Sequence, residues 1–253
     1  MADENGDAVV RHAVQLAPMS VPKASDVLAV ELRERILSGE YPEGTALPPE
    51  RELVTQTKMS RTTIREALRI LEVQGLVRIK TGRSGGAFVS RPGEESVADS
   101  VSLVIRGQQI RLVALLETRE AIEPVSARLA AKYRTDEDLA RLDAANEAIK
   151  EDGSLEDFLK ANVDWHEAVS IASQNELLTG FMLGLSKAIY ASTDNSAFID
   201  TEVRATAARA HKSVTDAIRA QDMDAAQRRM ARHVHGYAEA VVGVEERTEI
   251  VVP

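Results

Sequence analysis

Residues 47–90 read LPPERELVTQTKMSRTTIREALRILEVQGLVRIKTGRSGGAFVS. The segment opens with Pro48 and Pro49, and proline suits the first turn of a helix because it has no amide hydrogen to lose there. Acidic residues follow at once, and they stabilise the positive end of a helix dipole. We therefore predict a short helix over residues 49–57, followed by a tight turn.

A second helix is predicted to start after Ser60, whose hydroxyl is a good N-cap. Its residues divide between two faces. Apolar residues fall on one face and arginines recur every fourth residue on another: Ile64, Ala67, Leu68 and Leu71 against Arg61, Arg65 and Arg69. One face is expected to pack and the other to reach phosphates and bases.

A glycine-tipped hairpin is predicted after this helix. Gly75 stands where a left-handed closing residue is expected. Residues 76–80 and 87–89 favour two short strands around the glycine-rich segment 81–86. Helix, turn, helix and hairpin in this order indicate a winged helix-turn-helix of the α+β class, which predicts binding to double-stranded DNA.

The start of the second helix carries the residue types that such binding needs. Short hydroxyl side chains at 60, 62 and 63 can donate to phosphate oxygens, and Arg61 or Arg65 can address guanine edges. The alternative is a solvated amphipathic helix whose arginines only pair with Glu66 and Glu72. The preceding turn and the following hairpin favour the first interpretation.

The same segment resembles the DNA-binding domain of GntR-type bacterial transcription regulators, over about residues 25–91. Met59 stands where that family usually has valine, an apolar exchange that should leave DNA contact undisturbed. The resemblance implies that the EREL arginine, the start of the second helix and the tip of the hairpin meet DNA: Arg51, Ser60, Arg61, Thr62, Thr63, Arg65, Thr81 and Gly82.

The charge is divided unevenly along the chain. The 253 residues carry a net charge of −9, which is unusual for a protein that binds DNA. Residues 20–91, however, carry twelve Lys and Arg against nine Asp and Glu, or +3, and residues 92–253 carry eighteen against twenty-eight, or −10. The basic part is modest, so we expect weak non-specific affinity and a homodimer for useful binding.

Composition also bounds the domain organisation. Hydrophobic residues make up 44% of the chain, enough for two cores. No cysteine is present, which excludes disulfides and fits a cytoplasmic protein, and no apolar run is long enough to cross a membrane. The expected parts are a disordered tail (1–20), the winged domain (21–91), a linker (92–96), a helical effector-binding, metal-binding and dimerisation domain (97–245) and a C-terminal tail (246–253).

Everything after the linker is predicted to be α-helical. Alanine and leucine abound and no period-two strand pattern occurs. Helix-start signals stand at Thr135, Ser154 and Asp222, and Pro124 predicts a kink or a local break. Seven helices are expected, over residues 97–108, 109–132, 136–151, 155–173, 176–192, 202–221 and 223–242.

Histidines give this domain its chemistry. Asn162 and His166 are four residues apart on one helix face, so that both can grip one ion, whereas Asp164 points away. His211 and His233 have apolar neighbours at helical spacing, which favours the bundle interior. His235 is rotated away from His233. Each histidine alone could equally be an ordinary core or surface residue, and Trp165 and Tyr190 are expected to be core residues without a role.

Residues 97–242 resemble the FCD-type ligand-binding domain of the FadR branch of GntR regulators, through NVDWH, HKSVTDAIRAQD and MARHV. The resemblance implies an all-helical bundle in which Asn162, His166, His211 and His233 hold a divalent metal, zinc in the first place with nickel or manganese as alternatives. Asn162 replaces the commoner aspartate, so weaker metal binding is expected. Arg119 matches the family arginine that meets a small carboxylate effector; otherwise it would be a surface partner of Glu120 or Glu123.

The sequence thus predicts a mainly α-helical, homodimeric transcription regulator that is not an enzyme, and repression is the usual behaviour of the family that it resembles. A small organic acid bound beside the metal would change the spacing of the two winged domains through Pro92 and Gly93. Two alternatives stay open: a regulator that senses the ion itself, and a metalloenzyme that carries a DNA-binding module, although no HExxH motif is present.

Overall fold

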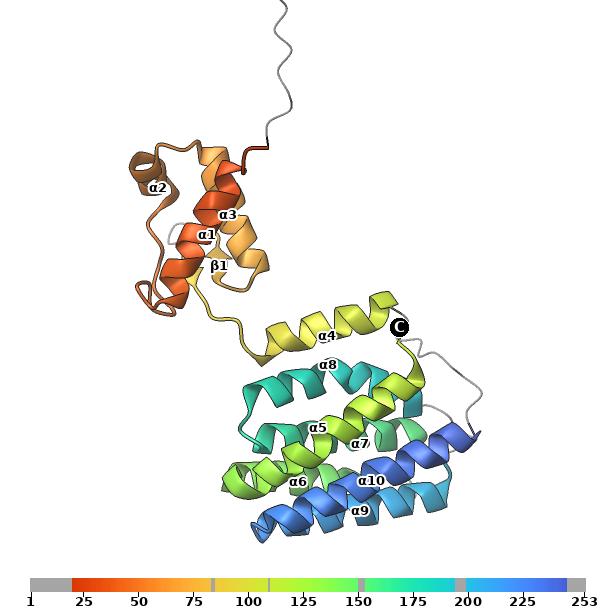
Figure 1. Cartoon of the computed structure of the whole chain (residues 1–253). Helices are drawn as coiled ribbons and strands as arrows, with labels where there is room; N and C mark the ends of the chain where they lie inside the picture. Colours follow the sequence, from red (N-terminus) through yellow and green to blue (C-terminus); the bar gives the residue numbers. More distant parts are fainter. Residues whose placement is uncertain (1–19, 83–84, 109, 150–152, 194–198, 245–253) are drawn as a thin grey trace, which may run out of the picture. The chain divides into compact units, whose positions relative to one another are not determined.

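The computed structural model describes residues 20–82, 85–108, 110–149, 153–193 and 199–244 (Figure 1). The chain divides into two compact units, of which the first ends at Arg91 and the second begins at Pro92. The tails predicted at the two ends lie outside the described residues, except for Ser20. Among the described helices, none combines the length and the apolar character that a membrane crossing needs.

The first unit contains three helices and a two-stranded antiparallel sheet. The strands pair with Val77 opposite Val89 and Lys80 opposite Gly86, so the predicted hairpin is confirmed to within one residue at each strand. In chain order the elements are α1 (Ala24–Leu37), α2 (Glu50–Thr57), α3 (Arg61–Val73), β1 (Val77–Lys80) and β2 (Gly86–Val89).

The helix boundaries around α3 follow from local chemistry. Pro49 is the N-cap of α2, which therefore begins one residue later than predicted, at Glu50. Ser60 caps α3, because its Oγ accepts a hydrogen bond from the amide of Thr63 at 3.1 Å. Gly75 has the predicted left-handed backbone, with φ of 71°. The predicted apolar face of α3 is buried in the core of the unit: Ile64, Ala67, Leu68 and Leu71.

Helix α1 is not among the elements predicted from the sequence. It packs against α3 and places Leu28, Leu32 and Ile36 in the same core. Its other apolar residues include Val27 and Val30, which are exposed, so the sequence shows no clean apolar stripe over this helix. This helix completes the core on which the hairpin and α3 rest.

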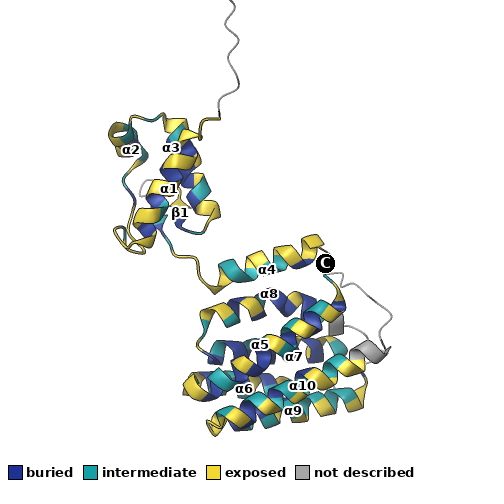
Figure 2. Cartoon of the chain, in the orientation of Figure 1, coloured by how far each residue is buried: buried dark blue, intermediate teal, exposed yellow. Residues whose placement is uncertain are grey.

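The second unit is a bundle of seven helices in its described residues. Buried residues lie mainly on the faces that the helices turn toward one another, and exposed residues on the outer faces (Figure 2). Helix α5 packs against α7, α9 and α10, and α4 packs against α8. The helices are α4 (Glu94–Gln108), α5 (Leu112–Tyr133), α6 (Asp136–Ala148), α7 (Leu155–Ala172), α8 (Glu176–Thr193), α9 (Thr201–Arg219) and α10 (Met223–Val244).

Two expectations about these helices are wrong. Helix α4 begins at Glu94, three residues earlier than predicted, because Glu94 and Glu95 suit a first helical turn, so the irregular part of the predicted linker is shorter. Helix α5 has no break at Pro124, which is buried, and continues to Tyr133; the alternative expectation of a kink stays a prediction. The predicted cap signals are confirmed at Thr135, at Ser154 and ahead of α10.

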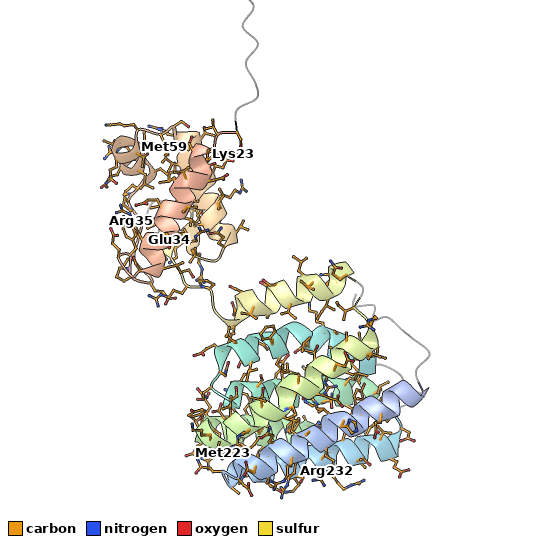
Figure 3. The ribbon with its side chains drawn as sticks, viewed as in Figure 1. Lys23, Glu34, Arg35, Met59, Met223 and Arg232 are labelled. Atoms are coloured by element: carbon orange, nitrogen blue, oxygen red, sulfur yellow. The ribbon has the colours of Figure 1, made fainter. Side chains whose placement is uncertain are left out.

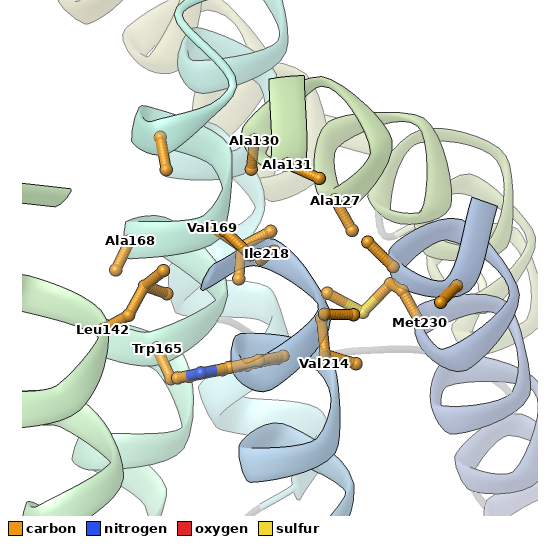
Figure 4. Packing of buried hydrophobic residues seen from close by; sticks show 14 of the residues in the cluster. Ala127, Ala130, Ala131, Leu142, Trp165, Ala168, Val169, Val214, Ile218 and Met230 are labelled. Atoms are coloured by element: carbon orange, nitrogen blue, oxygen red, sulfur yellow. The ribbon is translucent and has the colours of Figure 1, made fainter. Parts of the chain in front are cut away.

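The core that supports the site is built around Trp165 of α7. Its ring is fully buried and lies among Val214 and Ile218 of α9 and Met230 of α10 (Figure 4). Alanines are the commonest residues in the rest of this cluster and come from five helices, Ala127 of α5 among them. Small residues let the helices approach closely, so the polar side chains that adjoin this cluster on the same helices are held in fixed positions.

Candidate nucleic-acid interface and metal centre

The predicted DNA-contacting residues lie on the surface of the first unit. All are exposed except Thr63, which is half-buried. Met59 is partly buried against the core, so the exchange from valine affects packing and not the exposed face (Figure 3). A hollow of about 900 Å³ lies between the start of α2, α3 and the hairpin, and its lining includes Arg65, Lys80 and Gly82.

Two contacts order the start of α3. The hydroxyl groups of Ser60 and Thr63 lie 2.8 Å apart. The Arg65 Nε donates to both carboxylate oxygens of Glu50, at 3.1 and 2.9 Å. Glu50 lies fifteen positions earlier, at the start of α2, so this pair joins the two helices that the turn separates. From the sequence, Glu50 was expected only to stabilise the positive end of the helix dipole.

Three of the four predicted metal ligands converge inside the second unit. His166 of α7, His211 of α9 and His233 of α10 place one ring nitrogen each within 4.8 Å of the others, and His211 Nε2 lies 3.1 Å from His233 Nε2. Ligand nitrogens of a tetrahedral zinc site are about 3.4 Å apart, given Zn–N bonds of about 2.1 Å. Small side-chain shifts would therefore bring the three nitrogens onto one ion.

Asn162 lies one helical turn before His166 and is also buried. It lines a small cavity of about 30 Å³ together with Arg119, His166 and His233. Such a volume is sufficient for an ion or a water molecule. Asp164 is exposed, as predicted, and His235 is exposed as well, with its Nδ1 2.8 Å from Glu120 Oε1.

Arg119 is buried, with 3% of its surface exposed, and does not pair on the surface. Its Nε donates to Glu123 Oε1 at 2.6 Å, and its Nη2 lies 3.1 Å from His166 Nε2. The second oxygen of Glu123 lies 2.5 Å from His166 Nδ1. Glu123 thus lies between Arg119 and His166 and contacts both, which the sequence pattern did not predict.

Burial sets the protonation states of these groups. It lowers the pKa of His233 from 6.5 to about 3, lowers that of His211 well below 6.5, and also lowers that of His166. Burial alone would raise the pKa of Glu123, but the charge of Arg119 and the hydrogen bonds from Arg119 and His166 outweigh it and hold that pKa far below its usual value. The site therefore combines neutral imidazoles, the form that binds metals, with an ionised carboxylate.

Trp165 positions His211. The two rings stack with their centroids 3.8 Å apart, and Trp165 Nε1 donates to Thr215 Oγ1 at 3.1 Å. His211 Nδ1 is buried and has no hydrogen-bond partner among the described residues. The ring nitrogen of His211 that faces His233 is the other one, Nε2.

A larger hollow of about 540 Å³ adjoins the small cavity and lies between α9 and α10. Arg229 and Arg232 contribute to its lining, and Arg232 is on the exposed side of α10 (Figure 3). Four side chains line both spaces: Val203, Ala207, His233 and Tyr237. Rearrangement of these four side chains would join the larger hollow, named here the α9–α10 groove, to the small cavity.

Comparisons with known proteins agree with this division. Residues 24–89 match the family of bacterial regulatory proteins, gntR family, and residues 114–236 match the FCD domain. The chain is 33% identical, over 208 residues, to the galactonate operon transcriptional repressor of Escherichia coli K12, covering 80% of this chain and 90% of that relative. It is 28% identical to the HTH-type transcriptional repressor NanR of an Enterobacter species, covering 92% and 90%.

A solved structure also matches. The protein described as Streptococcus agalactiae GntR aligns with a TM-score of 0.57 and 25% sequence identity, over 85% of this chain and 99% of that one.

Proposed function

Because the chain belongs to the gntR family of bacterial regulatory proteins and carries an FCD domain, we propose that it is a transcriptional repressor controlled by a small carboxylate metabolite. The metabolite would bind next to a divalent metal in the second unit. The observation that carries this proposal is the convergence of three neutral imidazoles, two of which line one small cavity together with the buried Arg119.

The donor set fits a metal. His166, His211 and His233 would be ligands, with the amide oxygen of Asn162 as a fourth, and Glu123 would hold His166 by its Nδ1 so that Nε2 faces inward. The lowered pKa of each histidine supports the same conclusion, because only a neutral imidazole binds a metal. When bound, the metal would supply a concentrated positive charge for an anion to meet.

The charges favour an acid as the effector. Arg119 and Glu123 together carry no net charge, so a divalent ion would leave the buried site with about two positive charges in excess. Arg119 also presents a fork of donors, which suits a carboxylate. The cavity is smaller than an organic acid, and the adjoining α9–α10 groove gives it a route of access and room to expand.

DNA binding would require two copies of the chain. Each winged unit has a modest charge, and a homodimer would place two of them on a near-palindromic operator. An apolar groove of about 360 Å³ between α4, α5 and α8 supports self-association, as do the nearby exposed residues Leu103, Val104 and Phe181. Effector binding would change the relative placement of the winged units through Pro92 and Gly93.

The test is equilibrium binding to operator DNA, with and without a chelator, and then with a panel of organic acids that starts with galactonate. An effector-sensing repressor responds to one acid, and Arg119→Lys removes that response while DNA binding persists. A response to the ion alone would instead establish a metal sensor, and consumption of the acid would establish an enzyme. The absence of any preferred DNA would refute the proposal.

A further inference from the structure

The contact between Glu50 and Arg65 has an unusual arrangement. Both carboxylate oxygens of Glu50 accept from the same atom, Arg65 Nε. The two terminal nitrogens of this guanidinium, Nη1 and Nη2, make no hydrogen bond or ion pair with another described residue. The side chain of Arg65 is 73% exposed and that of Glu50 is 38% exposed. The terminal nitrogens of Arg65 are therefore available to a ligand, while its Nε is held by Glu50.

This pair contributes little to stability. Exposed ion pairs typically stabilise a folded protein by no more than about 1 kcal/mol, because water already solvates both charges. Its effect is on conformation, since an arginine has several rotatable bonds and loses their freedom when it binds. A carboxylate that holds Nε removes part of that loss before any ligand arrives.

The free end of Arg65 matches one ligand in particular. Two parallel donors fit the O6 and N7 acceptors of guanine, the commonest specific contact in the major groove. A phosphate is a poor alternative at this position, because the negative charge of Glu50 would repel it. The carboxylate thus favours the base edge over the DNA backbone.

We propose that Glu50 is a positioning residue that presents Arg65 to a guanine and thereby sets the sequence specificity of DNA binding. This inference rests on the proposed function, because it requires an operator. Glu50 would lower the affinity for DNA in general, through its charge, and raise the preference for duplexes that carry the guanine.

The experiment compares Glu50→Gln with Glu52→Gln in the full-length protein. Both variants remove one negative charge from α2, but Glu52 contacts Gln56 and not Arg65. A preferred duplex is first selected from a random library with the unaltered protein. Affinities are then measured for that duplex, for versions with each guanine replaced by adenine, and for random DNA. Thermal melting verifies that each variant is folded.

We expect Glu52→Gln to tighten binding to all duplexes by a similar factor. Glu50→Gln should lose about fivefold or more of the discrimination at one guanine. Arg65→Ala should lose discrimination at the same position, and the double variant should lose no more than Arg65→Ala alone.

Full discrimination by Glu50→Gln, or effects of the two single variants at different base pairs, would overturn this inference and leave the proposed function intact. An unaltered protein that selects no duplex would instead overturn the proposed function, and the inference with it.

Discussion

Single residues decide the chemistry of the buried site, and Glu123 has two partners there. One oxygen accepts from Arg119 and the other lies against His166. A buried arginine without a counter-charge is strongly destabilising, and an unsupported imidazole rotates. Glu123 therefore keeps the arginine tolerable inside the bundle and keeps the histidine in one orientation.

Asn162→Asp should strengthen metal binding by about tenfold, because a charged oxygen ligand replaces a neutral one. Isothermal titration calorimetry with zinc measures the change. Asp164→Asn is the matched control, since it alters the charge of the same helix at an exposed position and should leave the affinity unchanged. Equal affinities of Asn162→Asp and the unaltered protein would show that residue 162 is not a ligand.

The stability of the metal-free protein should fall as the pH is lowered below 6.5. The folded pKa values of His166, His211 and His233 lie below 6.5, that of His233 at about 3, so the unfolded chain takes up protons first. Stability is fully present above pH 6.5 and declines toward lower pH. Thermal melting in chelator between pH 7.5 and about 5 measures the slope.

His233→Gln should reduce that slope, because it removes one group that protonates only after unfolding. His235→Gln is the comparison of opposite sign: the pKa of His235 is raised, so its removal should not reduce the slope and should steepen it if anything. An unchanged slope in His233→Gln would contradict the assignment of the buried neutral form.

The sequence indicated which histidines converge, but it did not indicate which residues support them. Histidine is rare in this chain and helical spacing places it on a face, so His166, His211 and His233 could be selected. Glutamate is common on α5, where Glu117 is exposed and Glu123 is 3% exposed, and only the tertiary packing distinguishes them. For the same reason, the stacking of Trp165 on His211 could not be predicted.

At the scale of elements, α4 and α8 meet through glycine. An added Cβ at Gly184 would lie 2.6 Å from Val101 Cβ, and at Gly180 it would lie 2.7 Å from Val97 Cβ. The two helices are therefore in contact almost backbone to backbone. Helix α4 is held against the bundle by this contact, and it is the first helix after Pro92.

Gly184→Ala should destabilise the protein by about 1–3 kcal/mol, because the new methyl group overlaps the α4 backbone and Val101. Urea unfolding and hydrogen exchange of α4 amides measure the effect. Gly107→Ala is the control on α4, since nothing lies within 4 Å of its added Cβ, and it should be neutral or stabilising. Equal stability of the two variants would refute the close contact.

Elements with one clean pattern were predictable, and those with mixed patterns were not. The caps and apolar spacing of α3 gave its position directly. The apolar residues of α1 occur on both its buried and exposed sides, so only its packing on α3 reveals it. Pro124 would interrupt an isolated helix, but burial among neighbouring helices keeps α5 continuous.

The whole molecule separates charge between its units. Residues 20–91 carry +3 and residues 92–253 carry −10. The acidic unit repels DNA over a distance that salt limits to about 10 Å. We therefore expect operator affinity to come from two winged units acting together, as they would in the proposed homodimer.

Leu103→Glu should convert the dimer to a monomer and weaken operator binding by about a hundredfold. Leu103 is 72% exposed on α4, and a charge there would be buried in a dimer interface. Light scattering after gel filtration measures the oligomeric state. Val21→Glu, at a position that is 73% exposed, is the control. A dimeric Leu103→Glu variant would place the interface elsewhere.

The glycine-mediated junction of α4 and α8 also separates two demands on the chain. Helices in such close contact cannot shift independently of each other. A displacement of α8, which packs on the helix that carries His166, is therefore transmitted to α4 and is not taken up by flexible side chains. In the proposed function, the residues that would bind the metabolite are therefore different from those that would transmit its binding to α4. The metabolite-binding residues could therefore change during evolution to suit a new metabolite, while the glycine-mediated contact of α4 and α8 stays the same.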